Sequence, residues 1–298
     1  MKDKKSIILY KSLMHYVKDT NHLIELCSKL NKSKFLAIDT EFIREKTYWP
    51  KLCLIQVFNG EDKIIIDPLA KELDLKPFFK ILINNKIVKI FHSGRQDIEI
   101  FYNLTKKIPK NIYDTQIAAM VCGFGDSIGY ENLVSQLLGK KIDKTSRLTN
   151  WSNRPLSKKQ INYAISDVTH LFEIYPLIKD KIINNKRESW FKEEIKILIS
   201  KKTYDLNPNE SWKRLKYRNL NKNSIGILVE LAKWREIKAQ EKDVPRGNII
   251  RDDAIYELCS AQPKNKEDLN NLRSFNRKGS LKKEFAEEIL QVINKGIS

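Results

Sequence analysis

The sequence predicts an α/β domain built on a mixed sheet, followed by a small all-α domain. Apolar segments typical of strands come first along the chain, and segments with the period of a helix then alternate with one more strand. The C-terminal third contains no strand pattern, which predicts a separate helical domain. A turn-rich stretch, 204–209, marks the boundary, so we expect domains at residues 1–205 and 206–298.

The predicted sheet begins with an antiparallel meander. Residues 34–42, 52–58 and 63–67 are three apolar runs of strand length. Between the last two, the stretch 59–62 (NGED) is a hairpin signal, because Asn and Gly tolerate positive φ. Residues 87–91 predict a further buried strand.

Helical spacing of apolar residues predicts the remaining elements. The clearest helix begins at Lys158, after Ser157 as its N-cap, and its apolar positions keep a period of about 3.6 residues. We expect Pro176 to kink or interrupt this helix near its end. The other predicted helices cover residues 73–84, 96–104, 113–121, 131–138, 188–202, 224–242, 252–260, 266–272 and 282–294.

The composition favours a soluble protein that meets polyanions. Its 298 residues carry a formal net charge of +18, which attracts nucleic acid, although a solvated lysine surface explains part of the excess. The four cysteines form no CxxC pair and predict buried, reduced thiols. No apolar run reaches the length of a membrane span, and the N-terminal one is too short and too interrupted for a secretory signal. We therefore expect a cytoplasmic protein that does not enter a membrane.

Two carboxylates are predicted on one face of the first strand. Asp39 and Glu41 are two residues apart in FLAIDTEF, and side chains alternate between the faces of a strand. Two like charges held side by side are costly unless a cation neutralises them. A solvent-facing pair is the alternative, but apolar neighbours on either side argue against it. Because carboxylate clusters suit Mg²⁺ or Mn²⁺, the pair predicts a metal site.

Three further residues are expected to join this site. Tyr163 and Asp167 are four residues apart in a predicted helix, which stacks them on one face, and Asp97 lies near the start of another helix. Taken singly, they would be a core tyrosine, a surface aspartate and a carboxylate that complements a helix dipole. Together with Asp39 and Glu41 they are the set that a metal-dependent nuclease requires, because two metal ions can clamp the attacking and leaving oxygens of a phosphodiester.

The order and spacing of IDTEF, HSGRQD and YAISD resemble the DEDD superfamily of 3′→5′ exonucleases, in its tyrosine subclass, and more closely the ribonuclease D family. The segments IYDTQIAAM and WSNRPLSKKQINYAISDVTHL support this resemblance. The C-terminal LVELAKWREIKAQEKDVPRGNIIRDDAIYELCSAQP is similar to the helical domain called HRDC. The resemblance covers nearly the whole chain and implies a ribonuclease H-like exonuclease domain with a mixed sheet, followed by one HRDC domain.

The resemblance also implies a role for each of the five residues. Asp39 is expected to bridge two divalent ions, Mg²⁺ or Mn²⁺. Glu41 and Asp167 would join it around the ion that activates water, and Asp97 would help to hold the ion that stabilises the leaving 3′-oxygen. Tyr163 would orient the attacking water, a role that suits a phenol with an ordinary pKa of about 10.

The implied partner is RNA, and above all tRNA precursors with single-stranded 3′ tails. The expected products are nucleoside 5′-monophosphates released from the 3′ end. No stable protein partner is expected.

Four residues are predicted to contact the substrate, each with a structural alternative. Gln56 alternates with apolar neighbours in the second strand and either reaches the terminal nucleotide or is a sheet-surface glutamine. Tyr48 and Trp49 lie in a connection between strands, where aromatic rings stack on unpaired bases or pack in a core. His92 is interpreted as a structural or substrate-side residue, because the catalytic histidine of the other DEDD subclass would stand where this chain has Tyr163.

Two other functions would use the same residues. A DNA 3′→5′ exonuclease would need the same carboxylates, but the sequence matches ribonuclease D along its length and shows no polymerase or helicase segment. A non-catalytic RNA-binding protein on a degenerate nuclease scaffold is opposed by the presence of all five motif residues. The sequence therefore favours an RNA exonuclease.

Overall fold

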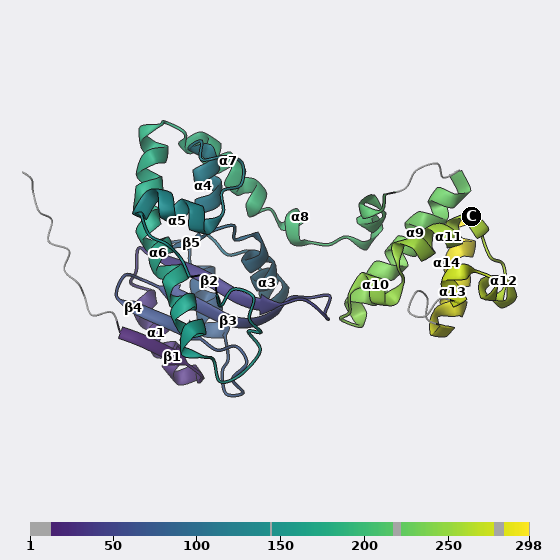
Figure 1. Cartoon of the computed structure of the whole chain (residues 1–298), viewed down its shortest axis with the longest axis horizontal. Coiled ribbons are helices and arrows are strands. Elements are labelled where there is room, and N and C mark those ends of the chain that lie inside the picture. The colour runs from purple at the N-terminus through teal and green to yellow at the C-terminus, as the bar shows by residue number, and fades with distance from the viewer. Residues whose placement is uncertain (1–12, 144, 217–221, 277–282, 298) are drawn as a thin grey trace, which may run out of the picture. The chain divides into compact units, whose positions relative to one another are not determined.

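The computed structural model forms two compact units (Figure 1). The first comprises the chain up to Ile43 together with Lys51–Tyr204, and the second comprises Arg44–Pro50 together with the chain from Asp205 onward. The segment Arg44–Pro50 connects two strands of the first unit, and nothing in the sequence pattern predicts that it belongs to the second. The structure describes residues 13–143, 145–216, 222–276 and 283–297.

A six-stranded mixed sheet forms the centre of the first unit. Its strands are β1 (Leu13–Val17), β2 (Phe35–Ile43), β3 (Lys51–Phe58), β4 (Asp62–Ile66), β5 (Val88–Phe91) and β6 (Ile112–Asp114). They lie in the order β1-β4-β3-β2-β5-β6. β2, β3 and β4 pair antiparallel, whereas β1 is parallel to β4, and β5 is parallel to both β2 and β6. This arrangement confirms the predicted meander and the mixed α/β class.

The two edge strands, β1 and β6, were not predicted from the sequence. β1 is short, and its first residue, Leu13, is 62% exposed, so its residues show no apolar alternation. β6 lies where the pattern predicts a helix beginning at Tyr113; that prediction is wrong at its start. The chain instead stays extended to Asp114, whose carboxylate accepts hydrogen bonds from the N–H groups of Gln116 and Ile117 and so begins the next helix.

Two helices of the first unit differ from the prediction: α1 was not predicted, and α6 continues beyond Pro176. Asp19 caps the unpredicted α1 by accepting a hydrogen bond from the N–H of His22. The long helix α6 continues through Pro176, because Ile174 and Ile178 on either side of the proline are buried and their packing outweighs the lost backbone hydrogen bond. The helices are α1 (Thr20–Leu30), α2 (Lys76–Leu82), α3 (Arg95–Thr105), α4 (Thr115–Val121), α5 (Tyr130–Leu138), α6 (Lys158–Asn184), α7 (Glu188–Leu198) and α8 (Lys201–Tyr204).

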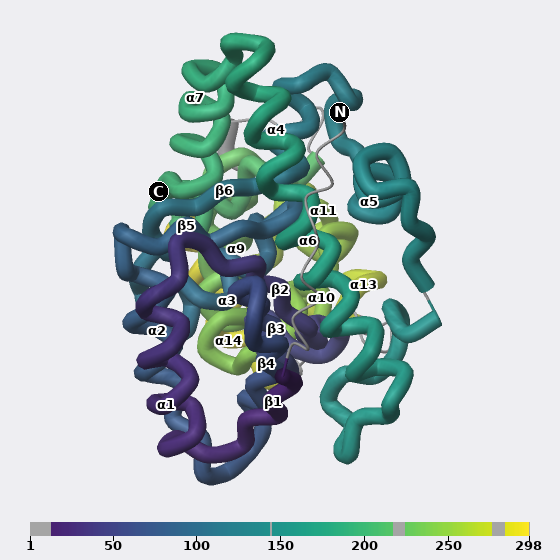
Figure 2. The backbone as a smooth tube through the Cα atoms, turned by 90° about the vertical axis from the view of Figure 1, so that its left-hand side faces the viewer, coloured from purple at the N-terminus to yellow at the C-terminus, as the bar shows by residue number. Residues whose placement is uncertain are grey.

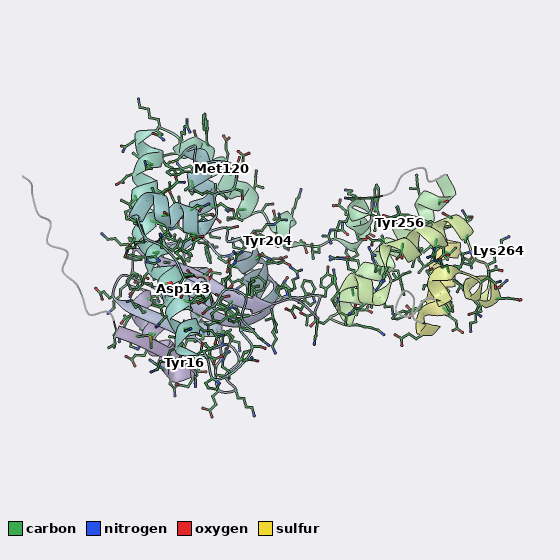
Figure 3. The ribbon with its side chains drawn as sticks, viewed as in Figure 1. Tyr16, Met120, Asp143, Tyr204, Tyr256 and Lys264 are labelled. Atoms are coloured by element: carbon green, nitrogen blue, oxygen red, sulfur yellow. The ribbon has the colours of Figure 1, made fainter. Side chains whose placement is uncertain are left out.

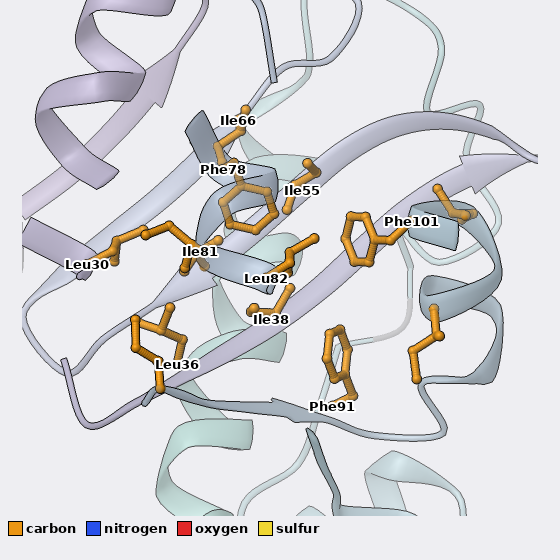
Figure 4. Packing of buried hydrophobic residues seen from close by; sticks show 14 of the residues in the cluster. Leu30, Leu36, Ile38, Ile55, Ile66, Phe78, Ile81, Leu82, Phe91 and Phe101 are labelled. Carbon is orange, nitrogen blue, oxygen red and sulfur yellow. The ribbon is translucent and has the colours of Figure 1, made fainter. Parts of the chain in front are cut away.

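Helices cover both faces of the sheet. On one face, α1, α2 and α3 enclose an apolar cluster that contains Leu36 and Ile38 of β2 (Figure 4). On the other face, α6 packs against β2, β3 and β4 (Figure 2). Ala37 lies in the cluster under α6, because alternate residues of β2 point to opposite faces. By the same alternation, Asp39 and Glu41 belong to the face that α6 covers.

The loop that leads into α6 is tied to the sheet by a partly buried ion pair. Arg154 Nε and Nη2 lie 2.7 Å from Asp67 Oδ2 and Oδ1, and Nη2 also donates to the Cys53 carbonyl at 2.6 Å. Tyr16 on β1 (Figure 3) donates to Asp67 Oδ2 at 2.9 Å. Such a bidentate pair fixes the orientation of the guanidinium as well as its distance from the carboxylate. The start of α6 is therefore held at one place on the sheet.

The described elements of the second unit are helical, in agreement with the prediction. Its core contains Leu231, Ile255 and Ile289, and also Tyr48 from the segment Arg44–Pro50. The predicted helix 282–294 begins at a residue outside the described part of the chain. The elements are η1 (Pro208–Arg214), α9 (Lys222–Glu241), α10 (Arg246–Ile249), α11 (Asp252–Ala261), α12 (Lys266–Asn270), α13 (Arg273–Asn276), η2 (Lys283–Phe285) and α14 (Ala286–Ile297). Among the described helices of both units, none has the length and apolar character needed to cross a membrane.

Candidate active site

Strand β2 presents two of the predicted carboxylates. Asp39 lies opposite Gln56 of β3, and Glu41 lies opposite Leu54. The register shifts directly after Glu41. Irregularities of this kind bend a strand and re-aim its side chains. Both carboxylates therefore end the regular part of the strand on the side covered by α6.

Helix α6 brings Tyr163 and Asp167 to the same side. Its first turn is fixed by a capping box, in which Ser157 Oγ accepts from the N–H of Gln160 at 3.2 Å and the Gln160 side chain bonds back to the cap. Val168 is fully buried against the sheet, which sets the rotation of the helix. Asp167 is buried too, and its Oδ1 has no hydrogen-bond partner among the described residues.

Three carboxylates converge at this point. One oxygen each from Asp39, Glu41 and Asp167 lies within 4.8 Å of the other two. Burial, and then the charges of the surrounding carboxylates, hold the pKa of Asp39 well above its ordinary value. Burial raises the pKa of Asp167 to about 7 and, with neighbouring carboxylates, that of Glu41 to about 9, although the charge of Arg147 acts in the opposite direction on Glu41. The cluster thus holds more negative charge than the protein around it neutralises.

Asp97 is the fourth carboxylate and comes from α3. It is 7% exposed, and its Oδ1 accepts a hydrogen bond from the Thr40 hydroxyl at 2.5 Å. Burial raises its pKa to about 6, while the hydrogen bond from Thr40 acts to lower it. Asp97 is not one of the three carboxylates within 4.8 Å, but its charge raises the pKa of both Asp39 and Glu41, so it lies beside them.

Asp114 positions Asp97, a role that no sequence motif indicated. Its buried carboxylate accepts from the N–H of Ser93 at 3.1 Å and of Gly94 at 2.7 Å, directly before α3. Gly94 has ordinary negative φ and is needed for space, because a Cβ there would lie 2.6 Å from Phe91 Cβ. The available signal was an aspartate placed just before a helix, which is typical of an N-cap.

His92 and Tyr130 form a wall next to the cluster. His92 Nδ1 lies 2.9 Å from Thr115 Oγ1, and its ring centroid lies 5.1 Å from that of Tyr130. The Tyr130 hydroxyl donates to the main-chain carbonyl of Asp167, a contact that no sequence motif indicated. Burial lowers the pKa of His92, which favours a neutral ring. A structural or substrate-side role for His92 stays a prediction.

The other three predicted substrate contacts are buried or partly buried. Tyr48 is 3% exposed in the core of the second unit, and Trp49 packs partly buried against the same core, so Tyr48 follows the packing alternative. Gln56 is 0% exposed and therefore offers no surface to a nucleotide. Its Nε2 and Oε1 have no hydrogen-bond partner within the described structure, and an unpaired buried polar group costs about 1–3 kcal/mol.

The donor set fits a divalent metal ion. Every group in the cluster offers carboxylate oxygen, which hard cations such as Mg²⁺ prefer. The raised pKa values and the unpaired Oδ1 of Asp167 show a site whose charge the protein itself leaves uncompensated. Asp39, Glu41 and Asp167 can hold one ion together, and Asp97 lies beside Asp39.

Comparison with known proteins shows the family to which the chain belongs. Residues 14–183, more than half of the chain, match a 3′-5′ exonuclease family, and residues 224–293 match the HRDC domain. Ribonuclease D of Bartonella henselae is 44% identical over 288 residues, which are 97% of this chain and 71% of that protein. Ribonuclease D of Nitrobacter hamburgensis is 40% identical over 285 residues, which are 96% of this chain and 74% of that protein.

Solved structures show the same fold. The crystal structure of Escherichia coli RNase D, described as an exoribonuclease involved in structured RNA processing, matches 94% of this chain and 74% of its own with a TM-score of 0.86 and 29% identity. Brucella melitensis NrnC with bound Mg²⁺ matches 70% of this chain and 98% of its own with a TM-score of 0.56 and 24% identity, which shows a shared fold. With its carboxylate cluster, its ribonuclease H-like domain and its HRDC region, this chain belongs to the ribonuclease D family of 3′-5′ exoribonucleases.

Proposed function

We propose that this enzyme shortens the 3′ tails of tRNA precursors by a two-metal-ion hydrolysis that releases nucleoside 5′-monophosphates. The observation that carries the proposal is the convergence of Asp39, Glu41 and Asp167 within 4.8 Å, with Asp97 beside them. The ribonuclease D relatives and the net charge of +18 support RNA as the substrate.

The carboxylates would divide between two ions. Asp39, Glu41 and Asp167 would hold the first, and Asp39 with Asp97 the second. Bound divalent ions lower the pKa of water and stabilise charge on the attacking and leaving oxygens. Asp39 would serve both ions, because the charges of Asp97 on one side and of Glu41 and Asp167 on the other all raise its pKa.

Tyr163 would orient the attacking water and would not remove its proton. Burial, and then the charges of Asp167 and Glu41, raise the pKa of its hydroxyl, so the phenol stays protonated at neutral pH. Its ring lies 6.0 Å from that of the buried Trp151, which restricts its movement. A neutral, fixed hydroxyl is suited to hold a water molecule in line with the phosphorus.

Among the described residues, Arg147 would offer a positive charge to a substrate phosphate. It is exposed, and it is close enough for its charge to lower the pKa of Glu41. A guanidinium in this position would bind the phosphate backbone without reading its sequence. The arrangement therefore supports a nuclease that recognises a strand end by its charge.

The test compares a tRNA precursor carrying a single-stranded 3′ tail with a DNA strand of matched sequence, each in Mg²⁺, Mn²⁺ or EDTA. We expect stepwise shortening of the RNA only with metal, an end point at the base-paired stem, and 5′-monophosphate products. Preferential digestion of the DNA, or products with 3′-phosphates, would contradict the proposal.

A matched pair of variants separates catalysis from folding. Asp39→Asn should lower the rate of hydrolysis by at least about 100-fold, while RNA binding and folding survive. The loss should be this large because Asp39 is itself a metal ligand, and even residues that only hydrogen-bond to a ligand typically cost about 10- to 100-fold. Asp126→Asn, at an exposed position, is the control and should retain full activity. Undiminished hydrolysis by Asp39→Asn would show that the site is wrongly assigned.

A further inference from the structure

Gln56 lies next to Asp39 in the sheet. It is opposite Asp39 on β2 and opposite Ile65 on β4, so its side chain shares a face with Asp39 beneath α6. Residues directly opposite each other in an antiparallel pair have Cβ atoms about 4.5–5.5 Å apart. The amide of a glutamine extends two further carbons and therefore reaches the carboxylate of an opposing aspartate.

Packing does not explain a glutamine at this position. Gln56 is 0% exposed, and neither atom of its amide is hydrogen-bonded to any residue that the structure describes. The residues two places away on the same face of β3 are Leu54 and Phe58, both buried. A leucine or methionine would fill the same space without leaving polar atoms unpaired.

We infer that Gln56 is a positioning residue that donates an amide N–H to the carboxylate of Asp39 when that carboxylate holds metal. The inference rests on the metal-binding role of Asp39 in the proposed function. Ligating carboxylates are themselves commonly oriented by hydrogen bonds from groups behind them. Asp39 needs this orientation most, because it is the carboxylate expected to contact both ions.

The chemistry of the amide suits this role. It donates a hydrogen bond without bringing a positive charge, so it orients Asp39 and does not compete with the metal. A lysine or arginine in its place would form an ion pair with Asp39 and occupy its oxygens. Because Gln56 is fully buried, it acts on metal binding through Asp39 and makes no contact with RNA, which replaces the nucleotide contact expected from the sequence.

A direct Mn²⁺ titration of Gln56→Met tests the inference, with free Mn²⁺ followed by electron paramagnetic resonance. Methionine has a similar length and volume but cannot donate. We expect Mn²⁺ affinity to fall by about tenfold or more. The kcat on 3′-tailed RNA should fall while KM stays constant, and the melting temperature in EDTA should be unchanged or higher because an unpaired amide has been removed.

Leu54→Met is the matched control, because Leu54 is buried on the same face of the same strand. It should keep the Mn²⁺ affinity of the wild type. In an Asp39→Asn background, Gln56→Met should weaken Mn²⁺ binding no further, because the Asp39 carboxylate that Gln56 orients has already been removed. Wild-type Mn²⁺ affinity in a folded Gln56→Met protein, or an equal loss in Leu54→Met, would overturn the inference.

Metal binding and substrate choice are read out separately. A wild-type protein that binds Mn²⁺ but leaves RNA tails intact would contradict the proposed function, and the Gln56 comparison would still decide the inference. A wild-type protein that binds no Mn²⁺ would contradict both.

Discussion

Two buried carboxylate sites, Glu236 in the second unit and the cluster around Asp39 in the first, treat their charge in opposite ways. In the second unit, Glu236 is 2% exposed and is bound by Arg246 through Nε at 2.5 Å and Nη2 at 2.7 Å, with Arg214 at 3.5 Å. In the first unit, Asp39, Glu41 and Asp167 face one another without a comparable ion pair to any residue that the structure describes. A structural carboxylate is accompanied by its own cations, whereas a catalytic cluster leaves room for cations from solution.

The pKa values record the same contrast. Burial alone would raise the pKa of Glu236, but hydrogen bonds from Arg246 and Tyr48 hold it below its ordinary value. Burial and mutual repulsion raise the pKa values of the first-unit cluster instead. Burial therefore does not distinguish the two kinds of site; the presence or absence of a positively charged donor does.

Among the variants that test this contrast, Asp167→Asn should show the largest effect on activity. Removing this ligand should lower kcat on 3′-tailed RNA by at least about 100-fold. The free energy of unfolding in EDTA should stay constant or rise, because one of the repelling charges is gone. Steady-state kinetics and denaturant melts check both parts. A large loss of stability in EDTA would show that the cluster is structural, like Glu236.

Glu236→Ala should show the largest effect on stability. It should lower the free energy of unfolding by about 3 kcal/mol, because Arg246 loses its partner inside the second unit. The value is at the low end for a buried pair, since the Arg246 side chain is 31% exposed and water can solvate it. Glu210→Gln, which breaks the exposed pair with Lys213, is the control and should change stability by less than about 1 kcal/mol.

The metal-free enzyme should lose stability as the pH rises from 5 to about 9. Asp97, Asp167 and Glu41 have folded-state pKa values of about 6, 7 and 9, above their ordinary values of about 4. The folded state therefore binds more protons, and the stabilisation present at low pH is lost as the pH passes through each folded-state pKa.

Saturating Mg²⁺ should replace these protons. The rise in melting temperature on adding Mg²⁺ should consequently be larger at pH 8.5 than at pH 6, as calorimetry would measure. Asp167→Asn removes one of the titrating groups and should reduce the difference. An equal Mg²⁺ effect at both pH values would contradict the raised pKa values.

The sequence predicted the site better than its surroundings, for a physical reason. Asp39, Glu41 and the pair Tyr163 and Asp167 lie in regular elements whose periods fix which side chains share a face. Asp114 and Tyr130 escaped because they act through backbone groups, Asp114 on N–H donors and Tyr130 on a carbonyl. Such contacts depend on tertiary approach and leave no side-chain period.

Gln56 and Tyr48 show a second limit. For Gln56 the sequence left open a nucleotide contact or a place on the sheet surface, and for Tyr48 it left open base stacking or core packing. Gln56 is buried by α6, and Tyr48 by helices of the second unit, both of which come much later in the chain. Burial by distant elements is what a local pattern cannot report.

Tyr48→Phe should show the smallest effect and sharpens the contrast between the units. Tyr48 donates to Glu236 and accepts from Arg246 Nη2 at 2.9 Å and Gln240 Nε2 at 3.1 Å. Losing the hydroxyl should lower the free energy of unfolding by about 1 kcal/mol, because Arg246 still neutralises Glu236 and the phenyl ring still fills the core. Affinity for RNA should be unchanged, since the ring is buried.

The matched variant Tyr48→Leu separates packing from recognition. It removes the aromatic ring, and we expect a further loss of stability with RNA affinity again unchanged in a folded protein. A loss of RNA affinity without a loss of stability in Tyr48→Leu would show that Tyr48 contacts RNA. If both variants instead act on stability alone, Tyr48 serves the core of the second unit. The small effect of Tyr48→Phe would then show that Glu236, a carboxylate with several donors, tolerates the loss of one.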